Sequence, residues 1–214
     1  MKELSTKVDS IPSAGTKADS DMQPIAGSSS HNSSKPHVGG SCHREENLYT
    51  PNCIRTFTGI YVNVFEPTPE MICIEDIAHA LSNQCRFSGH LPTFYSVAQH
   101  TVAMSKLMHE SYKLAALLHD ASEAYLLDIP SPIKKGLSNY KEIEDKLMIL
   151  IAEKFGFQYP LHEKVKEVDN YMLQWEWSTL MLGKSIFPKI ECWSPNDAKR
   201  YLLSTFKELG CVTA

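Results

Sequence analysis

From about residue 74 to residue 209, apolar side chains recur at intervals of three and four residues. This spacing gives each segment one apolar face of an α-helix to bury. Gly156 and Gly210 stand where two of these helices would end, and the run Ser-Pro-Asn-Asp at 194–197 is typical of a helix start. The chain is therefore predicted to be all-α, with helices at about 74–83, 94–109, 112–127, 138–155, 161–183 and 196–209.

Two segments of different composition precede these helices. Residues 1–47 contain no Phe, Tyr or Trp and are crowded with Ser, Gly, Pro and Lys. They offer too little apolar surface to offset the entropy of ordering, so we expect a disordered tail whose three histidines are inert. Residues 56–65 are β-branched and aromatic with one glycine, which favours a short β-hairpin. One folded domain is expected over residues 48–214.

Composition limits the classes of binding partner and the cellular compartment that we expect. The 214 residues carry a formal net charge of −4, whereas binding a long nucleic acid needs a concentrated basic surface. A small phosphorylated ligand needs only a few local cations and is not excluded. The six cysteines include no C-x-x-C pair, which favours reduced thiols over a zinc ribbon or a disulfide framework. No secretory signal and no apolar run of membrane-spanning length is seen, so we expect a soluble, cytoplasmic protein with no membrane partner.

Imidazole and carboxylate side chains interrupt the apolar stripes. His119 and Asp120 are neighbours within one apolar run, while His100 and Asp169 lie on the stripes of two others. Each alone is readily interpreted as a core group with a hydrogen-bond partner, because buried polar groups need one. Three helices that each bury such a group are better explained by a shared divalent ion. Glu123 follows His119 by four residues and is expected on the same side, one turn further on.

Longer motifs around these residues resemble a known family. The order His100, His119-Asp120, Asp169 is similar to the H…HD…D signature of the HD phosphohydrolase superfamily. Four blocks closely resemble one branch of it: Cys-Arg-Phe at 85–87, Tyr-Ser-Val-Ala-Gln-His at 95–100, His-Asp-Ala-Ser-Glu-Ala-Tyr at 119–125, and Asp-Ile-Pro-Ser-Pro-Ile-Lys at 128–134. That branch holds bacterial 5′-deoxynucleotidases and phage-type dATP triphosphohydrolases. The similarity covers about residues 56–181 and implies an HD-domain helical bundle.

The resemblance also implies a metal centre and two catalytic acids. The four signature residues would hold one divalent ion (Mn, Co, Zn, Fe or Mg). These ligands are His100, His119, Asp120 and Asp169. Such an ion polarises a phosphoryl group and activates water near neutral pH. Glu123 and Asp128 resemble the catalytic acids of the branch, and Glu123 is the one expected to orient or deprotonate the water.

Three further residues resemble the substrate contacts of the branch. Arg86 is expected to bind phosphate through its planar guanidinium, and Lys134 to add a second positive charge. The alternatives are a surface salt bridge and a solvated turn. Phe87 is expected to lie next to the sugar or base and to contribute apolar contact. It stands where the deoxynucleotidases have a tryptophan that helps to read the sugar, so selectivity for deoxyribose is not carried over. Glu176 and Trp177 are expected to pack their own helix; for Glu176, two turns past Asp169, a place behind the metal ligands is the alternative.

These expectations combine into one functional hypothesis. The chain is expected to hydrolyse the bond between the 5′-oxygen and the α-phosphate of a small nucleotide, as a 5′-deoxynucleotidase or a dNTP triphosphohydrolase. Two alternatives stay open: a non-catalytic nucleotide sensor, and a hydrolase of cyclic or hyperphosphorylated nucleotide signals. We also expect the protein to form a homo-oligomer.

Overall fold

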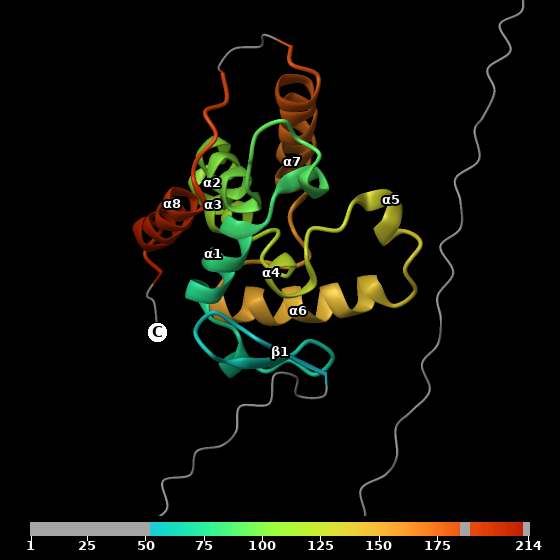
Figure 1. Ribbon diagram of the computed structural model, residues 1–214. Coiled ribbons are helices and arrows are strands. Elements are labelled where there is room, and N and C mark those ends of the chain that lie inside the picture. The colour runs from blue at the N-terminus through green and yellow to red at the C-terminus, as the bar shows by residue number, and fades with distance from the viewer. Residues whose placement is uncertain (1–51, 185–188, 212–214) are drawn as a thin grey trace, which may run out of the picture. The chain divides into compact units, whose positions relative to one another are not determined.

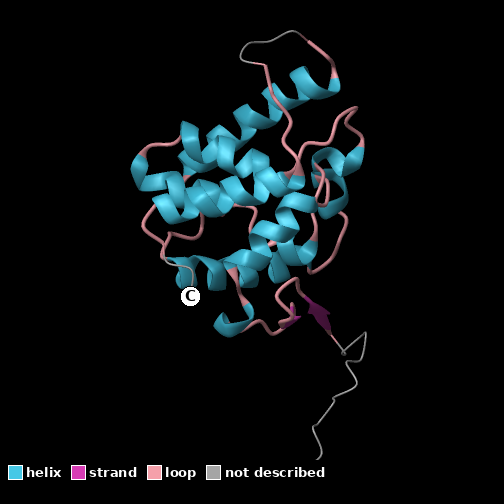
Figure 2. Cartoon of the chain, turned by 60° about the vertical axis from the view of Figure 1, so that its left-hand side comes forward, coloured by secondary structure: helices cyan, strands magenta, loops and turns pink. Residues whose placement is uncertain are grey.

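The computed structural model describes residues 52–184 and 189–211. Helices dominate these residues, and the strands among them are confined to one hairpin (Figure 2). The elements follow in the order β1 (Cys53–Arg55), β2 (Tyr61–Asn63), η1 (Pro69–Met71), α1 (Ile74–Asn83), η2 (Arg86–Gly89), α2 (Val97–Leu107), α3 (Glu110–Leu117), α4 (Glu123–Leu126), α5 (Ser131–Lys134), α6 (Tyr140–Phe155), α7 (Glu163–Glu176), η3 (Trp177–Met181) and α8 (Pro195–Glu208). The predicted fold class is confirmed. The tail predicted over residues 1–47 lies outside the described residues.

The hydrophobic core lies where α1, α2, α3 and α8 pack together (Figure 1). Its largest fully buried side chains include Ile77, Leu81, Leu202 and Phe206. Burial of each such side chain contributes about 1.5–3 kcal/mol relative to exposure. Helix α7 packs against α2 and α3 beside this core, which brings the middle of α7 close to His100. Within the described residues, no helix is long and apolar enough to cross a membrane.

The helix boundaries follow capping residues at several points. Helix α2 begins later than predicted, because the Ser96 hydroxyl accepts a hydrogen bond from the Gln99 backbone and caps the first turn. Ser194 caps α8 in the same way, as its sequence predicts. Gly156 ends α6 with a φ of +79°, a left-handed conformation that glycine adopts without strain.

The hairpin is confirmed, but its first strand is displaced from the predicted segment. Strands β1 and β2 pair antiparallel, with Ile54 opposite Val62. The turn between them is closed by a hydrogen bond from the backbone of Gly59 to the carbonyl of Thr56. Gly59 has a φ of +92° within this turn, so residues 56–60 form the turn and β1 lies before Thr56 rather than after it.

The single helix predicted over residues 112–127 is wrong. Helix α3 ends at Leu117, residues 118–122 form a tight turn, and α4 begins at Glu123. The turn is held by bonds between residues three apart, such as Glu123 N to Asp120 O. Likewise, the helix predicted over 161–183 changes to the π-helical turn η3 after Glu176. Both departures from the predicted helices lie at candidate site residues. The turn contains His119 and Asp120, and the π-helical turn follows Glu176.

Candidate metal centre and adjoining pockets

Two buried histidines approach each other from different elements. His100 lies on α2 and is fully buried, while His119 lies in the turn after α3. The Nδ1 of His119 lies 2.7 Å from the carbonyl oxygen of Ala116. Because a carbonyl only accepts hydrogen bonds, Nδ1 carries the proton and Nε2 is left with a free lone pair in the neutral ring. The turn thus fixes both the orientation and the tautomer of His119.

Glu176 fixes the second imidazole in the same way. Its Oε1 lies 2.6 Å from Nδ1 of His100 and also accepts a hydrogen bond from the Tyr95 hydroxyl at 2.9 Å. Burial alone would raise the pKa of Glu176, but His100 and Arg86 outweigh it and lower that pKa. The ionised carboxylate accepts only, so Nδ1 of His100 donates and its Nε2 is free. Glu176 thus takes the place that was the alternative to helix packing, behind a candidate metal ligand.

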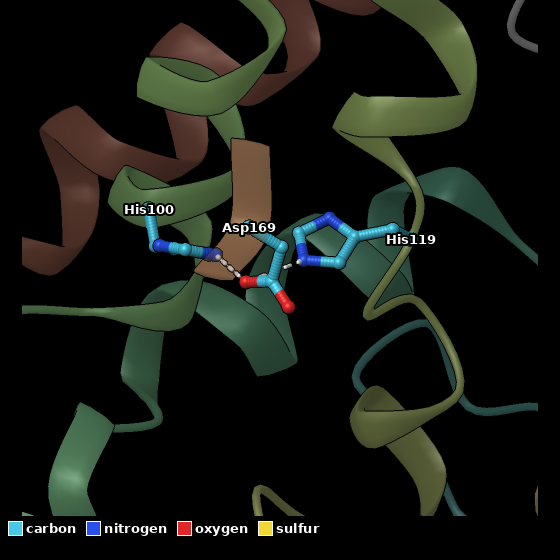
Figure 3. Close-up of side chains that lie close together, drawn as sticks. All are labelled: His100, His119 and Asp169. Atoms are coloured by element: carbon cyan, nitrogen blue, oxygen red, sulfur yellow. Dashed lines mark ion pairs between the residues drawn. The ribbon is translucent and has the colours of Figure 1, made fainter. Parts of the chain in front are cut away.

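Asp169 closes the group from α7. Its Oδ1 lies 3.2 Å from Nε2 of His100 and 3.7 Å from Nε2 of His119, and the three side chains converge on one point (Figure 3). Among the described residues, neither Nε2 atom has a hydrogen-bond partner, although both are buried. The ligand atoms of the three residues all lie within 4.8 Å of one another.

These three side chains, His100, His119 and Asp169, are called the metal group because their arrangement is able to hold a metal ion. Ligands at about 2.0–2.2 Å from a tetrahedral or octahedral ion are separated from their neighbours by roughly 2.8–3.6 Å. The distances between Asp169 Oδ1 and the two imidazole nitrogens fall in or close to this range. An ion would also satisfy both buried Nε2 atoms, which are otherwise costly. Two imidazoles and a carboxylate are donors that suit a divalent transition metal.

Asp120, the fourth predicted ligand, lies beside the group. Its Oδ2 is 3.2 Å from Nε2 of His119 and 3.7 Å from Nη1 of Arg86. Burial tends to raise its pKa, but His119 and other cationic neighbours lower the pKa to about 2. Asp120 and Asp169 in turn hold the pKa of His119 well above its ordinary value, against the effect of burial. The carboxylates therefore make a site of negative potential for a cation, whether proton or metal.

Arg86 is buried rather than part of a surface salt bridge. Its side chain is 10 % exposed, and its Nε donates to Oε2 of Glu176 at 3.0 Å. The carboxylates of Glu176 and Asp120 raise the pKa of Arg86 although burial opposes them. Glu176 thus links the arginine to His100 in one buried network. Arg86 still borders the pocket beside the metal group, where it was predicted to meet phosphate.

Glu123 and Asp128 line the same pocket as Arg86. Glu123 is buried at the first position of α4, and its Oε2 has no hydrogen-bond partner among the described residues. Burial raises the pKa of Glu123 well above its ordinary value, and the nearby Asp120 and Asp128 raise it further. Burial likewise raises the pKa of Asp128. Both predicted acids are therefore placed where carboxyl groups retain protons to higher pH.

Lys134 has carboxylate partners in this structure. Its Nζ lies 3.0 Å from Oε1 of Glu123 and 2.9 Å from Oε1 of Glu144 on α6. It borders the pocket but is not the solvated turn of the alternative interpretation, since its side chain is largely covered. Sequence reasoning missed Glu144, because only the folding of α6 against α5 brings the two together.

Two pockets meet at the metal group. One, of about 560 Å³, holds Arg86 and Phe87 on one wall and residues from the end of α7 on the other. The second, of about 510 Å³, lies toward α6 and includes Lys141 and Lys166. Asp120, Glu123 and Asp169 line both pockets. The predicted metal-binding, catalytic and phosphate-contacting residues are thus gathered in one region.

Trp177 does not pack its helix as expected. It lines the 560 Å³ pocket, and its ring lies 5.9 Å from that of Phe87. A spacing of four residues joins Asp169, Leu173 and Trp177, which would have indicated a shared face.

Comparison with known proteins gives the chain relatives but no activity. No family model matches it. It is 44% identical over 139 residues to the uncharacterized protein YfdR of Escherichia coli (strain K12), covering 64% of this chain and 78% of that protein. It is 35% identical over 122 residues to an uncharacterized protein of Rhodobacter capsulatus, covering 52% of this chain and 62% of the relative. On this similarity, the chain belongs to the same protein family as YfdR.

Proposed function

We propose that this chain is a metal-dependent nucleotide phosphohydrolase of the HD type. The substrate is a 5′-nucleotide, and the bond cleaved is the one between its α-phosphorus and its 5′-oxygen. The observation that carries the proposal is the pair of buried Nε2 atoms of His100 and His119, which lack hydrogen-bond partners among the described residues and face Asp169. A divalent ion is the partner that fits these three groups together.

The residues around this centre support phosphoester hydrolysis rather than simple ion storage. When bound, a divalent ion supplies Lewis-acid polarisation of a phosphoryl oxygen and activation of water near neutral pH. Arg86 is held by Glu176 at a fixed position on the pocket wall, where its guanidinium orients the phosphate. Preorganised donors of this kind stabilise charge that develops in the transition state.

Two carboxyl groups are placed to move the protons. Oε2 of Glu123 has no hydrogen-bond partner among the described residues and borders the pocket, so this oxygen accepts a proton from the attacking water. Asp128 borders the same pocket with a raised pKa and is placed to protonate the departing 5′-oxygen. The products are then a nucleoside and a phosphate species whose length depends on the substrate.

The proposal is tested with the full chain, loaded with Mn²⁺ or Co²⁺ and incubated with matched ribo- and deoxynucleoside mono- and triphosphates. Chromatography identifies the products. Nucleoside with phosphate indicates a nucleotidase, and nucleoside with tripolyphosphate a triphosphohydrolase. Asp169→Asn is expected to abolish turnover, while Glu167→Gln, an exposed site on the same helix, retains it. Nucleotide binding without any product would instead support the sensor alternative and contradict the enzyme.

A further inference from the structure

The pocket beside Arg86 has an apolar end that the proposed phosphate chemistry does not use. Phe87, Ile129, Leu173 and Trp177 supply its apolar lining. A volume of about 560 Å³ falls in the range typical of small-ligand sites, about 300–1,000 Å³. Apolar walls next to a phosphate-orienting arginine suit a ligand that is charged at one end and flat and apolar at the other.

Helix α7 and the η3 turn carry one wall of this pocket. Asp169, Leu173 and Trp177 are spaced by four residues and line one pocket, so α7 and the η3 turn that continues it present a carboxylate of the metal group and an indole. The intervening Glu176 is fully buried and anchored to Arg86 and His100. Trp177 directly follows that anchor, at the start of the π-helical turn, yet it is 46% exposed. Because the preceding residue is held in place by these hydrogen bonds, the exposure of Trp177 does not result from fraying of the helix end.

Phe87 forms the facing wall in a strained conformation. Both Phe87 and Ser88 have positive φ angles, 54° and 53°. Such angles in residues other than glycine cost of order 1–3 kcal/mol each and cluster at ligand sites. The Phe87 ring also lies 5.7 Å from the guanidinium carbon of Arg86. The backbone strain thus accompanies an aromatic ring placed directly beside the phosphate-orienting group.

The two rings form a corner rather than a slot. Their centroids are 5.9 Å apart and their planes are inclined by 47°. A base inserted between two parallel rings needs roughly 7 Å between them, because carbon contacts are at about 3.5–4.0 Å. The rings already contact each other, so a flat ligand packs against the corner that they form. We propose that Phe87 and Trp177 form an aromatic corner that binds the base of the nucleotide.

That the ligand is a nucleotide rests on the proposed function. The corner adds the two residues, Phe87 and Trp177, that set the affinity for its base. The order along the pocket is the metal group, Arg86, Phe87 and Trp177. A nucleotide whose α-phosphate lies at Arg86 therefore has its base at the corner. Stacking tolerates any base, because every base has an aromatic face. The corner accordingly favours nucleotides over phosphomonoesters that lack a base, without choosing one base strongly.

The experiment compares a deoxynucleoside 5′-monophosphate with 2-deoxyribose 5-phosphate, which carries the same phosphoester and no base. For Trp177→Ala, kcat/KM for the nucleotide is expected to fall roughly 10- to 100-fold, as base–aromatic contacts do on alanine substitution. Turnover of the sugar phosphate should stay unchanged. Tyr171→Ala is the matched control, since Tyr171 is an aromatic residue of the preceding helix α7, 63% exposed and outside the pocket. An equal loss on both substrates, or no loss on the nucleotide, would overturn the aromatic corner.

A binding measurement separates the corner from the proposed reaction. Thymidine and 2′-deoxyadenosine, which lack phosphate, are titrated into wild type and both variants by calorimetry. Weaker binding in Trp177→Ala alone supports the corner even if no nucleotide is hydrolysed, in which case only the proposed function fails. Identical nucleoside affinities in wild type and Trp177→Ala contradict the corner even if nucleotides are hydrolysed.

Discussion

Glu176→Gln tests the buried network most sharply. The carboxylate accepts three hydrogen bonds: Arg86 donates to Oε2, while Tyr95 and His100 donate to Oε1. An amide of the same shape has only one accepting oxygen. If that oxygen faces Arg86, the amide nitrogen donates to His100 Nδ1, which moves the imidazole proton to Nε2 and removes the lone pair for metal. If the oxygen faces His100, the amide nitrogen takes the place of Oε2. The amide N–H and the Nε–H of Arg86 are then two donors that face each other with no acceptor.

Either orientation carries a measurable cost. Loss of a hydrogen bond to a charged group costs about 1.5–3 kcal/mol. For a domain of this size, each kcal/mol lowers Tm by about 2–4 °C, so the metal-free variant should melt about 3–12 °C lower. Replacement of a residue that orients a metal ligand typically weakens metal binding about 10- to 100-fold.

The assay combines a thermal melt in chelator with a calorimetric titration of Mn²⁺. Glu167→Gln, an exposed glutamate of the same helix, serves as the control and should match wild type in both. A Glu176→Gln protein with wild-type metal affinity would refute the reasoning, whatever its Tm, because the tautomer of His100 would then not depend on this carboxylate.

Three further predictions concern the proposed proton acceptor, the end of α6 and the candidate metal ligand His119. Glu123→Gln should lower kcat by roughly 10²–10⁴-fold with little change in KM, because it removes the proton acceptor but not the pocket; a rise in KM alone would make Glu123 a binding residue. Gly156→Ala should destabilise the protein by about 1–2 kcal/mol, since φ is +79° there, and leave kcat unchanged; an unaltered Tm would contradict this assignment of the α6 end. Metal affinity should rise with pH, because Asp120 and Asp169 raise the pKa of His119 and a proton competes with metal below that pKa; calorimetry across a pH series that shows no slope would exclude His119 as a ligand.

Periodicity predicted the helices well where packing is uniform. The bounds of α1 are those expected from its apolar stripe. The break between α3 and α4 was not predictable in this way, because Leu117, Leu118 and Ala121 all stay buried across the turn and preserve the apolar pattern. Polar groups on apolar stripes did identify His100, His119 and Asp169 as residues that converge.

Contacts between different segments of the chain could not be predicted without the folded structure. The position of Glu176 behind the metal group was only the alternative to helix packing, and its simultaneous bonds to Arg86, Tyr95 and His100 join residues 76–90 positions apart. The carboxylate partners of Lys134 and the contact of Trp177 with Phe87 likewise depend on tertiary packing. No local pattern encodes such pairs, whereas helical periodicity is a local property.

The central claim is that His100, His119 and Asp169 bind one divalent ion. A titration of the metal-free protein with Co²⁺, followed by visible absorption and by metal analysis after dialysis, tests it most directly. Wild type is expected to saturate at one ion per chain and Asp169→Ala to lose that ion, with Glu167→Gln unaffected. Wild-type protein that retains no ion, or an Asp169→Ala variant that binds Co²⁺ as wild type does, would contradict it.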